Sequence, residues 1–207
     1  MLIFFEQKLV FLAVPKTGTT GIEAGLKGYA DIVYRRRPAL KHTPARKFNN
    51  TIAPYLKDVH KLEAETFAVI RDPVDQLRSW FKYRHKPSLD GTPKSTKGIS
   101  FDDFVQSFLS KDPPPFAKLG TQWRFLSGRN GQVLVDHLFA YEKPLALHDF
   151  LQERFHDSPI LPVKNVSPVG IDTSLSGETE ALLRQRLAPD FALHQEVTAA
   201  GHWMRKP

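Results

Sequence analysis

Short apolar runs alternate with longer stretches of helical periodicity along this chain. Runs rich in β-forming residues cover residues 9–14, 31–34, 66–71 and 133–141, and residues 4–6 can pair with the first of them through a tight turn. The stretches between them have the apolar spacing of helices, at residues 21–29, 52–56, 73–83, 101–109, 116–126, 143–155 and 178–187. This alternation predicts an α/β fold with a central parallel sheet and helices on both of its faces.

The length of the chain sets the expected number of domains. Its 207 residues are enough for one such domain with a sizeable core, and they contain no internal repeat. We therefore expect residues 1–207 to form a single domain. The polar segment 87–100 contains Gly91, Pro93 and Gly98, which is typical of a mobile loop. That loop is either a lid that closes on a substrate or a disordered insertion.

Composition narrows the class of protein. The chain has no cysteine, which excludes disulfides, thiolate metal sites and cysteine nucleophiles. No histidine–acid cluster has metal-ligand spacing, so we expect no metal. The apolar start is interrupted at Glu6, Gln7 and Lys8 and lacks the features of a signal peptide, and no apolar run is long enough to span a membrane. These features predict a soluble, cytoplasmic protein.

The balance of charge indicates the chemistry of a partner. Lysine and arginine exceed aspartate and glutamate by enough to give a net charge of +7. Such an excess either makes a solvated basic surface or attracts a polyanion. Charge alone leaves a nucleotide, a nucleic acid and an acidic polysaccharide open as ligands.

The segment after the first long apolar run is the most specific motif in the chain. It reads Pro15-Lys16-Thr17-Gly18-Thr19-Thr20 and leads directly into a helical pattern. A turn between a strand and a helix N-terminus offers unpaired N–H groups and the positive end of the helix dipole to an anion. The lysine precedes the glycine, which is not the order of an ATP-binding G-x-x-x-x-G-K-[ST] loop. The alternative is a structural turn that only caps the helix.

A second anion site is predicted where the strand at residues 66–71 ends. Arg71 follows the buried run, and Asp72 and Pro73 are suited to the N-cap and the first position of the next helix. Ser79 lies two turns into that helix on the same face as its cap. Arg71 and Ser79 can therefore bind a phosphate together, since the arginine fork matches its oxygens. The alternative is a surface pair of Arg71 with Asp72.

Together the two motifs resemble the sulfotransferase superfamily, whose members use 3′-phosphoadenosine 5′-phosphosulfate (PAPS) and release adenosine 3′,5′-bisphosphate. Residues 15–20 look like the family's 5′-phosphosulfate loop, and Arg71-Asp72-Pro73 with Ser79 looks like its 3′-phosphate motif. The resemblance implies a three-layer α/β/α fold related to P-loop nucleotide enzymes. It also implies a cofactor-binding set of Lys16, Thr17, Gly18, Thr19, Thr20, Arg71 and Ser79, with Lys16 stabilising charge on the leaving group.

Sulfonate transfer to a hydroxyl requires in-line geometry and a base that takes the proton. His42 follows the second predicted strand, and a histidine in a corresponding place looks like the base of several carbohydrate sulfotransferases. An imidazole suits this role at neutral pH. Glu142, just after the strand at residues 133–141, is the carboxylate alternative, although it equally reads as a helix-start residue. His60 precedes a strand and is expected at the opposite edge of the sheet.

The basic residues near His42 are the only sequence feature that indicates the chemistry of the acceptor. Six basic residues surround His42 in sequence, which favours a hydroxyl on an anionic glycan if they also surround it in space: Arg35, Arg36, Arg37, Lys41, Arg46 and Lys47. Segment 161–167 resembles a late motif of carbohydrate sulfotransferases, with Lys164 as either a phosphate contact or a solvated residue. Trp80, Trp123 and Phe125 are candidates for stacking on adenine, and each fits a core position as well.

Other classes of function fit less well. A small-molecule kinase requires the G-K-[ST] order that the loop lacks. A nucleic-acid-binding module is permitted by the charge, but no helix-turn-helix, RNA-recognition or zinc-finger signature is present, so we expect no nucleic acid partner. A cofactor-binding relative without activity also agrees with the two motifs if His42 is not the base.

Overall fold

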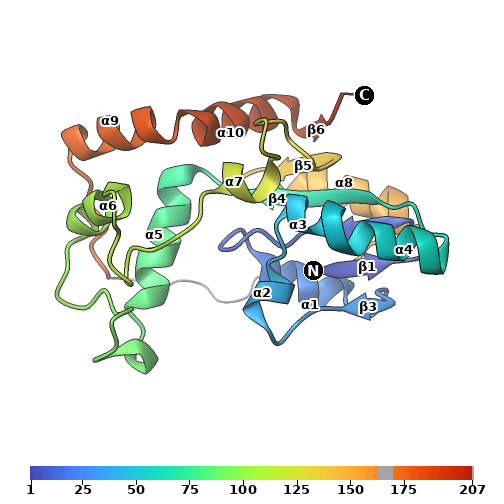
Figure 1. The fold of residues 1–207 in the computed structure, drawn as a ribbon, viewed down its shortest axis with the longest axis horizontal. Coiled ribbons are helices and arrows are strands. Elements are labelled where there is room, and N and C mark those ends of the chain that lie inside the picture. Colours follow the sequence, from blue (N-terminus) through green and yellow to red (C-terminus); the bar gives the residue numbers. More distant parts are fainter. Residues whose placement is uncertain (163–169, 207) are drawn as a thin grey trace.

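The computed structural model describes residues 1–162 and 170–206 and contains one six-stranded sheet in the order β3-β1-β2-β4-β5-β6 (Figure 1). Its strands are β1 (Leu2–Phe4), β2 (Leu9–Phe11), β3 (Ile32–Val33), β4 (Glu65–Ile70), β5 (His137–Ala140) and β6 (His202–Met204). Strands β2, β4 and β5 are parallel, whereas β1, β3 and β6 join through antiparallel pairs. The expected α/β fold is confirmed.

The sheet is parallel at its centre and antiparallel at its flanks, and the tight turn expected between residues 4–6 and the first long run is present. Only four residues connect β1 to β2, and so short a connection allows a hairpin but not the crossover that parallel strands need. Lys8 closes that hairpin with a bond from its N–H to the Phe5 carbonyl (3.2 Å) and adopts a left-handed conformation. The parallel centre therefore has its three carboxyl ends, before Leu12, Arg71 and Tyr141, at one edge.

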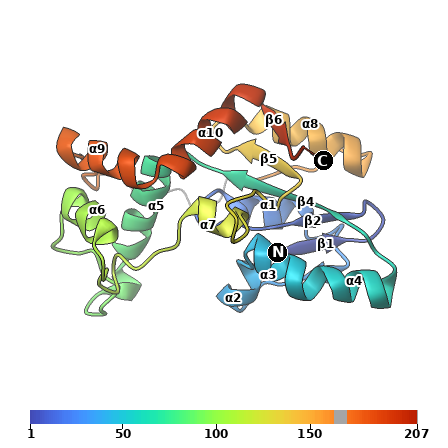
Figure 2. The ribbon, with the colours of Figure 1, turned by 45° about the horizontal axis from the view of Figure 1, so that its top comes forward.

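Helices cover both faces of the sheet. One face is covered by α1 (Thr19–Leu26) and α8 (Pro144–Phe155), whose apolar residues pack on alternate strand positions such as Phe11 and Phe67. The other is covered by α3 (Ala45–Lys47), the π-helix η1 (Phe48–Ile52), α4 (Ala53–His60), α7 (Gln122–Leu126) and α10 (Ala188–Ala200). Helices α4 and α8 lie on opposite sides of the strands (Figure 2). The alternating burial of strand residues thus gives three layers.

A third apolar cluster lies beside the sheet. It joins α5 (Pro73–Arg84), α6 (Phe101–Leu109) and α9 (Gly177–Arg186), which stand together at the left of Figure 1. Helix α5 starts as predicted, because the Asp72 carboxylate accepts a bond from the Asp75 N–H (3.0 Å) and Pro73 follows the cap. Since α5 leaves the sheet directly after β4, it holds this cluster next to the carboxyl edge.

Several element boundaries differ from the sequence predictions. The segment 35–47 lies outside every predicted helix, but it contains the short helices α2 (Pro38–Lys41) and α3. The helix expected at 116–126 is confined to α7, since Gly120 breaks the pattern and Thr121 caps a new start. Helix α10 and strand β6 were not predicted, although proline near the start of α10 and a left-handed Gly201 at its end are helix boundary signals.

The segment 87–100 contains the short 3₁₀ helix η2 (Pro87–Leu89) and is attached to α5 at one buried point. The Thr96 hydroxyl donates to the Phe81 carbonyl (2.9 Å), and its N–H donates to the Arg84 carbonyl (3.2 Å). The expected mobility of the segment stays a prediction. Among the described residues, no helix combines the length and the apolar character needed to cross a membrane.

Candidate active site

The turn between β2 and α1 presents backbone N–H groups to solvent. Lys16 and Gly18 both adopt left-handed conformations (φ 68° and 76°), which turns the chain sharply before α1. The Thr17 hydroxyl points inward and donates to the Val14 carbonyl (2.9 Å), so it braces the turn instead of facing a ligand. Within the described part of the chain, the N–H groups of Thr17 and Gly18 have no hydrogen-bond partner. The loop therefore offers donors that an anion can satisfy.

One face of α5 borders this loop. The Gln76 side-chain amide donates to the Pro15 carbonyl (2.8 Å), and two turns later the Tyr83 ring lies 4.2 Å from the Lys16 ammonium. Ser79 lies between them on the helix face defined by steps of three and four residues, and it is buried. Ser79 therefore lies on the face of α5 that borders the loop, and its part in an anion site stays a prediction.

Arg71 is held in place through its backbone at the end of β4. The buried Gln122 side chain accepts from the Arg71 N–H (2.9 Å) and donates to the Arg71 carbonyl (2.7 Å). The guanidinium lies 4.6 Å from the centre of the Tyr141 ring. Among the described residues, the buried Nε of Arg71 has no hydrogen-bond partner. An unsatisfied, buried and charged donor is costly, and an anion would satisfy it.

Tyr141 joins the two motifs, a role that sequence reasoning missed. Its N–H bonds to the Ile70 carbonyl (2.7 Å), which extends the β4–β5 ladder and brings the ring beside Arg71. A methyl group added at Gly18 would lie 2.8 Å from the same ring. The signal available in the sequence was an aromatic residue at the carboxyl end of a parallel strand, where ligands bind in such sheets.

His42 is oriented by the strand that leads into the loop. Its Nδ1 lies 2.7 Å from the Ala13 carbonyl oxygen, which can only accept, so Nδ1 carries the proton and Nε2 of the neutral ring is an acceptor. Desolvation by burial lowers the pKa of His42 below its ordinary value. The ring is therefore neutral at pH 7. Helix α2, which His42 ends, is fixed to α1 by the Lys41–Glu23 ion pair (2.7 Å).

Lys16 lies in a cationic environment. Burial, followed by the charges of Lys86 and Arg71, lowers its pKa from the ordinary value to about 8. Among the described residues it forms no ion pair with a carboxylate. Instead its ammonium lies 4.2 Å and 5.5 Å from the ring centres of Tyr83 and Trp80. Cations gathered without counter-ions indicate that an anionic ligand completes the site.

Glu142, the alternative base, is engaged by neighbouring groups. One carboxylate oxygen accepts from the Asp72 N–H (2.9 Å), and the other faces His194 Nε2 (3.1 Å). Burial acts to raise the pKa of Glu142, but the bonds from His194 and Asp72 outweigh it and lower the pKa. Its carboxylate thus ties the start of α5 to α10.

The other residues that the sequence suggested for binding the acceptor or the cofactor lie in different parts of the fold. Arg35, Arg36 and Arg37 line a surface hollow of about 490 Å³ together with Val33, Tyr34 and Leu40. Arg46 and Lys47 belong to α3. Trp80 lies near Lys16, whereas Trp123 and Phe125 pack against the core of the sheet. Lys164 and most of the segment 161–167 lie outside the described residues.

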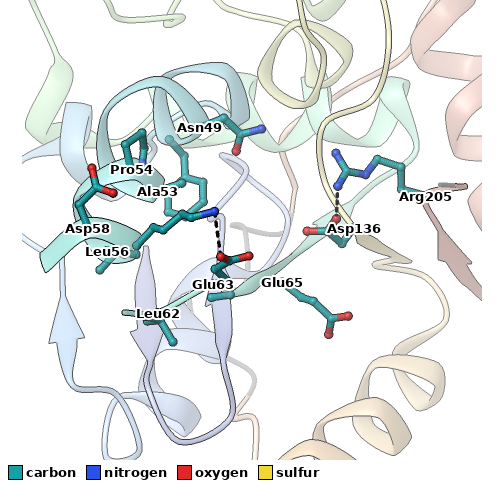
Figure 3. A pocket seen from close by; sticks show the side chains of 13 residues that line it. Asn49, Ala53, Pro54, Leu56, Asp58, Leu62, Glu63, Glu65, Asp136 and Arg205 are labelled. Carbon is teal, nitrogen blue, oxygen red and sulfur yellow. Dashed lines mark hydrogen bonds and ion pairs between the residues drawn. The ribbon is translucent and has the colours of Figure 1, made fainter. Parts of the chain in front are cut away.

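A hollow of about 520 Å³ lies at the other edge of the sheet (Figure 3). It contains none of the predicted site residues, and both of its cationic side chains are paired with carboxylates. Lys57 bonds to Glu63 (2.8 Å), and Arg205 bonds to Asp136 (2.6 Å), which also accepts from the Thr66 N–H. Because its two cations are already compensated and carboxylates line it as well, this hollow is a poor candidate for a polyanion site.

Comparison with known proteins shows the family of the chain. A protein-family model described as the sulfotransferase family matches residues 1–156. The match includes the loop after β2, His42, the start of α5 and Tyr141. No curated protein and no solved structure matches the chain.

Proposed function

We propose that this chain, which belongs to the sulfotransferase family, transfers a sulfonate group from PAPS to a hydroxyl of a carbohydrate or glycan-like acceptor. The observation that carries this proposal is the meeting of two anion motifs at one edge of the sheet. The loop after β2 and Arg71 after β4 both contact Tyr141, and neither has its donors satisfied within the described residues. We also propose that the three layers correspond to a P-loop-like fold.

The residues present fit a ligand with two phosphate-like groups. The free N–H groups of the turn suit the 5′-phosphosulfate, and Thr19 and Thr20 add hydroxyls at the start of α1. The unsatisfied Arg71 Nε and the buried Ser79 suit the 3′-phosphate. A side chain at Gly18 would collide with Tyr141, so this position keeps the cradle narrow. When bound, PAPS supplies the sulfonate that is transferred.

Lys16 and His42 have complementary charge states near pH 7. With a pKa of about 8, Lys16 is mostly protonated and stabilises negative charge that develops on the departing 5′-phosphate. With a lowered pKa, His42 is neutral and its Nε2 accepts the proton of the attacking hydroxyl. Glu142 is the weaker candidate for the base, since both of its oxygens already have partners.

The surface near His42 supports an anionic acceptor. Arg35, Arg36 and Arg37 line their hollow at the start of α2, the helix that His42 ends. Arginine binds carboxylate and sulfate groups through paired hydrogen bonds, so an acidic glycan matches this surface.

Calorimetric titration with adenosine 3′,5′-bisphosphate, ATP and AMP tests the nature of the donor. We expect the bisphosphate to bind much more tightly than the other two nucleotides. Equal binding of ATP would favour a kinase-like enzyme, and binding of none of them would overturn the proposal. A screen of neutral and acidic glycans with radiolabelled PAPS then tests the acceptor, and transfer to neutral glycans alone would contradict the role of the arginine surface.

A further inference from the structure

Tyr83 lies beside Lys16, but the proposed chemistry gives it no role. It lies on the last turn of α5 and is 43% exposed, so packing in a core does not explain its place. Two ammonium groups approach its ring, that of Lys16 at 4.2 Å and that of Lys86 at 4.9 Å from the ring centre. The edge of Trp80 packs against the same ring at 5.9 Å. Both distances between an ammonium group and the Tyr83 ring centre fall within the range of a cation–π interaction.

The Tyr83 ring takes the place of a carboxylate partner for the Lys16 ammonium. The charged groups that act on Lys16 from the neighbouring elements are Arg71 at the end of β4 and Lys86 after α5, and both repel it. No carboxylate pairs with it among the described residues. The negative face of an aromatic ring is then the main attractive surface for the ammonium. It also draws the long lysine side chain toward α5, the helix that carries Ser79.

We propose that Tyr83 is a positioning residue of the sulfotransfer site, whose ring holds the Lys16 ammonium charged and beside the loop before the donor binds. The inference rests on the proposed function and deepens it, because it explains how a lysine surrounded by cations stays protonated and ordered. Arginine and lysine neighbours alone would favour the neutral amine. The ring opposes them without the carboxylate that would compete with the phosphates of the ligand.

Three variants test the role of the ring. Tyr83→Leu removes the aromatic face, Tyr83→Phe keeps it, and Tyr55→Leu removes a similarly exposed tyrosine (52%) from α4 as a control. The readout is the pH dependence of Lys16 acetylation by acetic anhydride, followed by peptide mass spectrometry on the full chain without nucleotide. It reports the proton affinity of Lys16 directly and needs no activity.

We expect the labelling midpoint of Tyr83→Leu to move down by about half a pH unit or more. Tyr83→Phe and Tyr55→Leu should label like the unaltered protein. Equal midpoints in all four proteins, or an equal shift in Tyr83→Phe, would overturn the proposal. Binding of adenosine 3′,5′-bisphosphate to the unaltered protein is measured in parallel. If it is absent while the midpoint still shifts, the proposed function fails and only the interaction of the Tyr83 ring with Lys16 stands.

Discussion

At the edge of the sheet where β4 ends, Lys16 and Arg71 form no ion pair with any described carboxylate, whereas at the edge where β4 begins, Lys57 and Arg205 each form one. The same strand thus connects an edge with uncompensated positive charge to an edge whose charges are compensated. Both edges have hollows or turns that could admit a small molecule.

The difference teaches that unpaired charge, and not the size of a hollow, supports the proposal of an anion site at the edge where β4 ends. In the 520 Å³ hollow at the start of β4, both lining cations, Lys57 and Arg205, are paired with carboxylates that also line it. At the edge where β4 ends, the N–H groups of Thr17 and Gly18 and the buried Nε of Arg71 have no partner among the described residues, and the pKa of Lys16 is lowered to about 8. Such unsatisfied groups are costly in a folded protein and are typical of sites that a ligand completes.

Replacing the histidine at each edge should give the largest contrast. His42→Ala removes the group that we propose accepts the proton, so we expect turnover to fall by about 10²–10⁴-fold with nearly unchanged affinity for adenosine 3′,5′-bisphosphate. His60→Ala, at the start-of-strand edge near Phe5 and Tyr55, should retain full activity. Steady-state rates and calorimetry measure both effects. A fully active His42→Ala enzyme would show that another residue is the base.

The two lysines provide the second contrast. Lys16→Ala removes the positive charge that we propose stabilises both the bound phosphates and the negative charge that develops during transfer. We therefore expect a rate loss of about 10²–10³-fold together with weaker bisphosphate binding. Lys57→Ala breaks the pair with Glu63 and should leave both quantities unchanged. The same assays apply, and comparable losses in the two variants would remove the distinction between the edges.

The pH dependence of kcat/KM should have two limbs set by the carboxyl edge. As the pH falls below 6.5 and through the lowered pKa of His42, the base becomes protonated and the rate falls. As the pH rises through about 8, Lys16 loses its proton and the rate falls again. Lys86→Gln removes a like charge near Lys16, so it should move the alkaline limb upward. An alkaline limb that stays in place would mean that Lys16 does not cause it.

Two glycines with the same backbone conformation test how tightly Tyr141 closes the cradle. Gly18 and Gly131 both have φ of +76°, but only at Gly18 would a methyl group meet the Tyr141 ring, at 2.8 Å. We expect Gly131→Ala to cost about 1–2 kcal/mol in the free energy of unfolding and Gly18→Ala to cost more. Urea denaturation measures both, and combining Gly18→Ala with Tyr141→Ala should recover the excess. Equal costs would exclude the contact with Tyr141.

Much of the carboxyl edge could be predicted because its signals are local. Asp72 and Pro73 start α5 through contacts within four residues, and Lys16 and Gly18 mark the turn within one short segment. Two other contacts join segments far apart in sequence: Tyr141 lies against Gly18, and the Gln122 side chain bonds to the Arg71 backbone. No local pattern encodes such contacts.

Local patterns also failed where the packing of distant segments decides the structure. Strand β6 joins the sheet because α10 returns the chain to β5, which lies far from β6 in the sequence. The hydrophobic pattern predicts which segments are strands, but not the direction in which each one enters the sheet.

The preference for a 3′-phosphate is the most direct test of the carboxyl edge as the donor site. Calorimetry compares adenosine 3′,5′-bisphosphate with AMP for the unaltered protein, for Arg71→Gln and for Arg205→Gln at the other edge. We predict that the unaltered protein and Arg205→Gln prefer the bisphosphate, and that Arg71→Gln loses about tenfold to 10²-fold of this preference. A preference that survives in Arg71→Gln, or that is absent from the unaltered protein, would contradict the assignment of this edge.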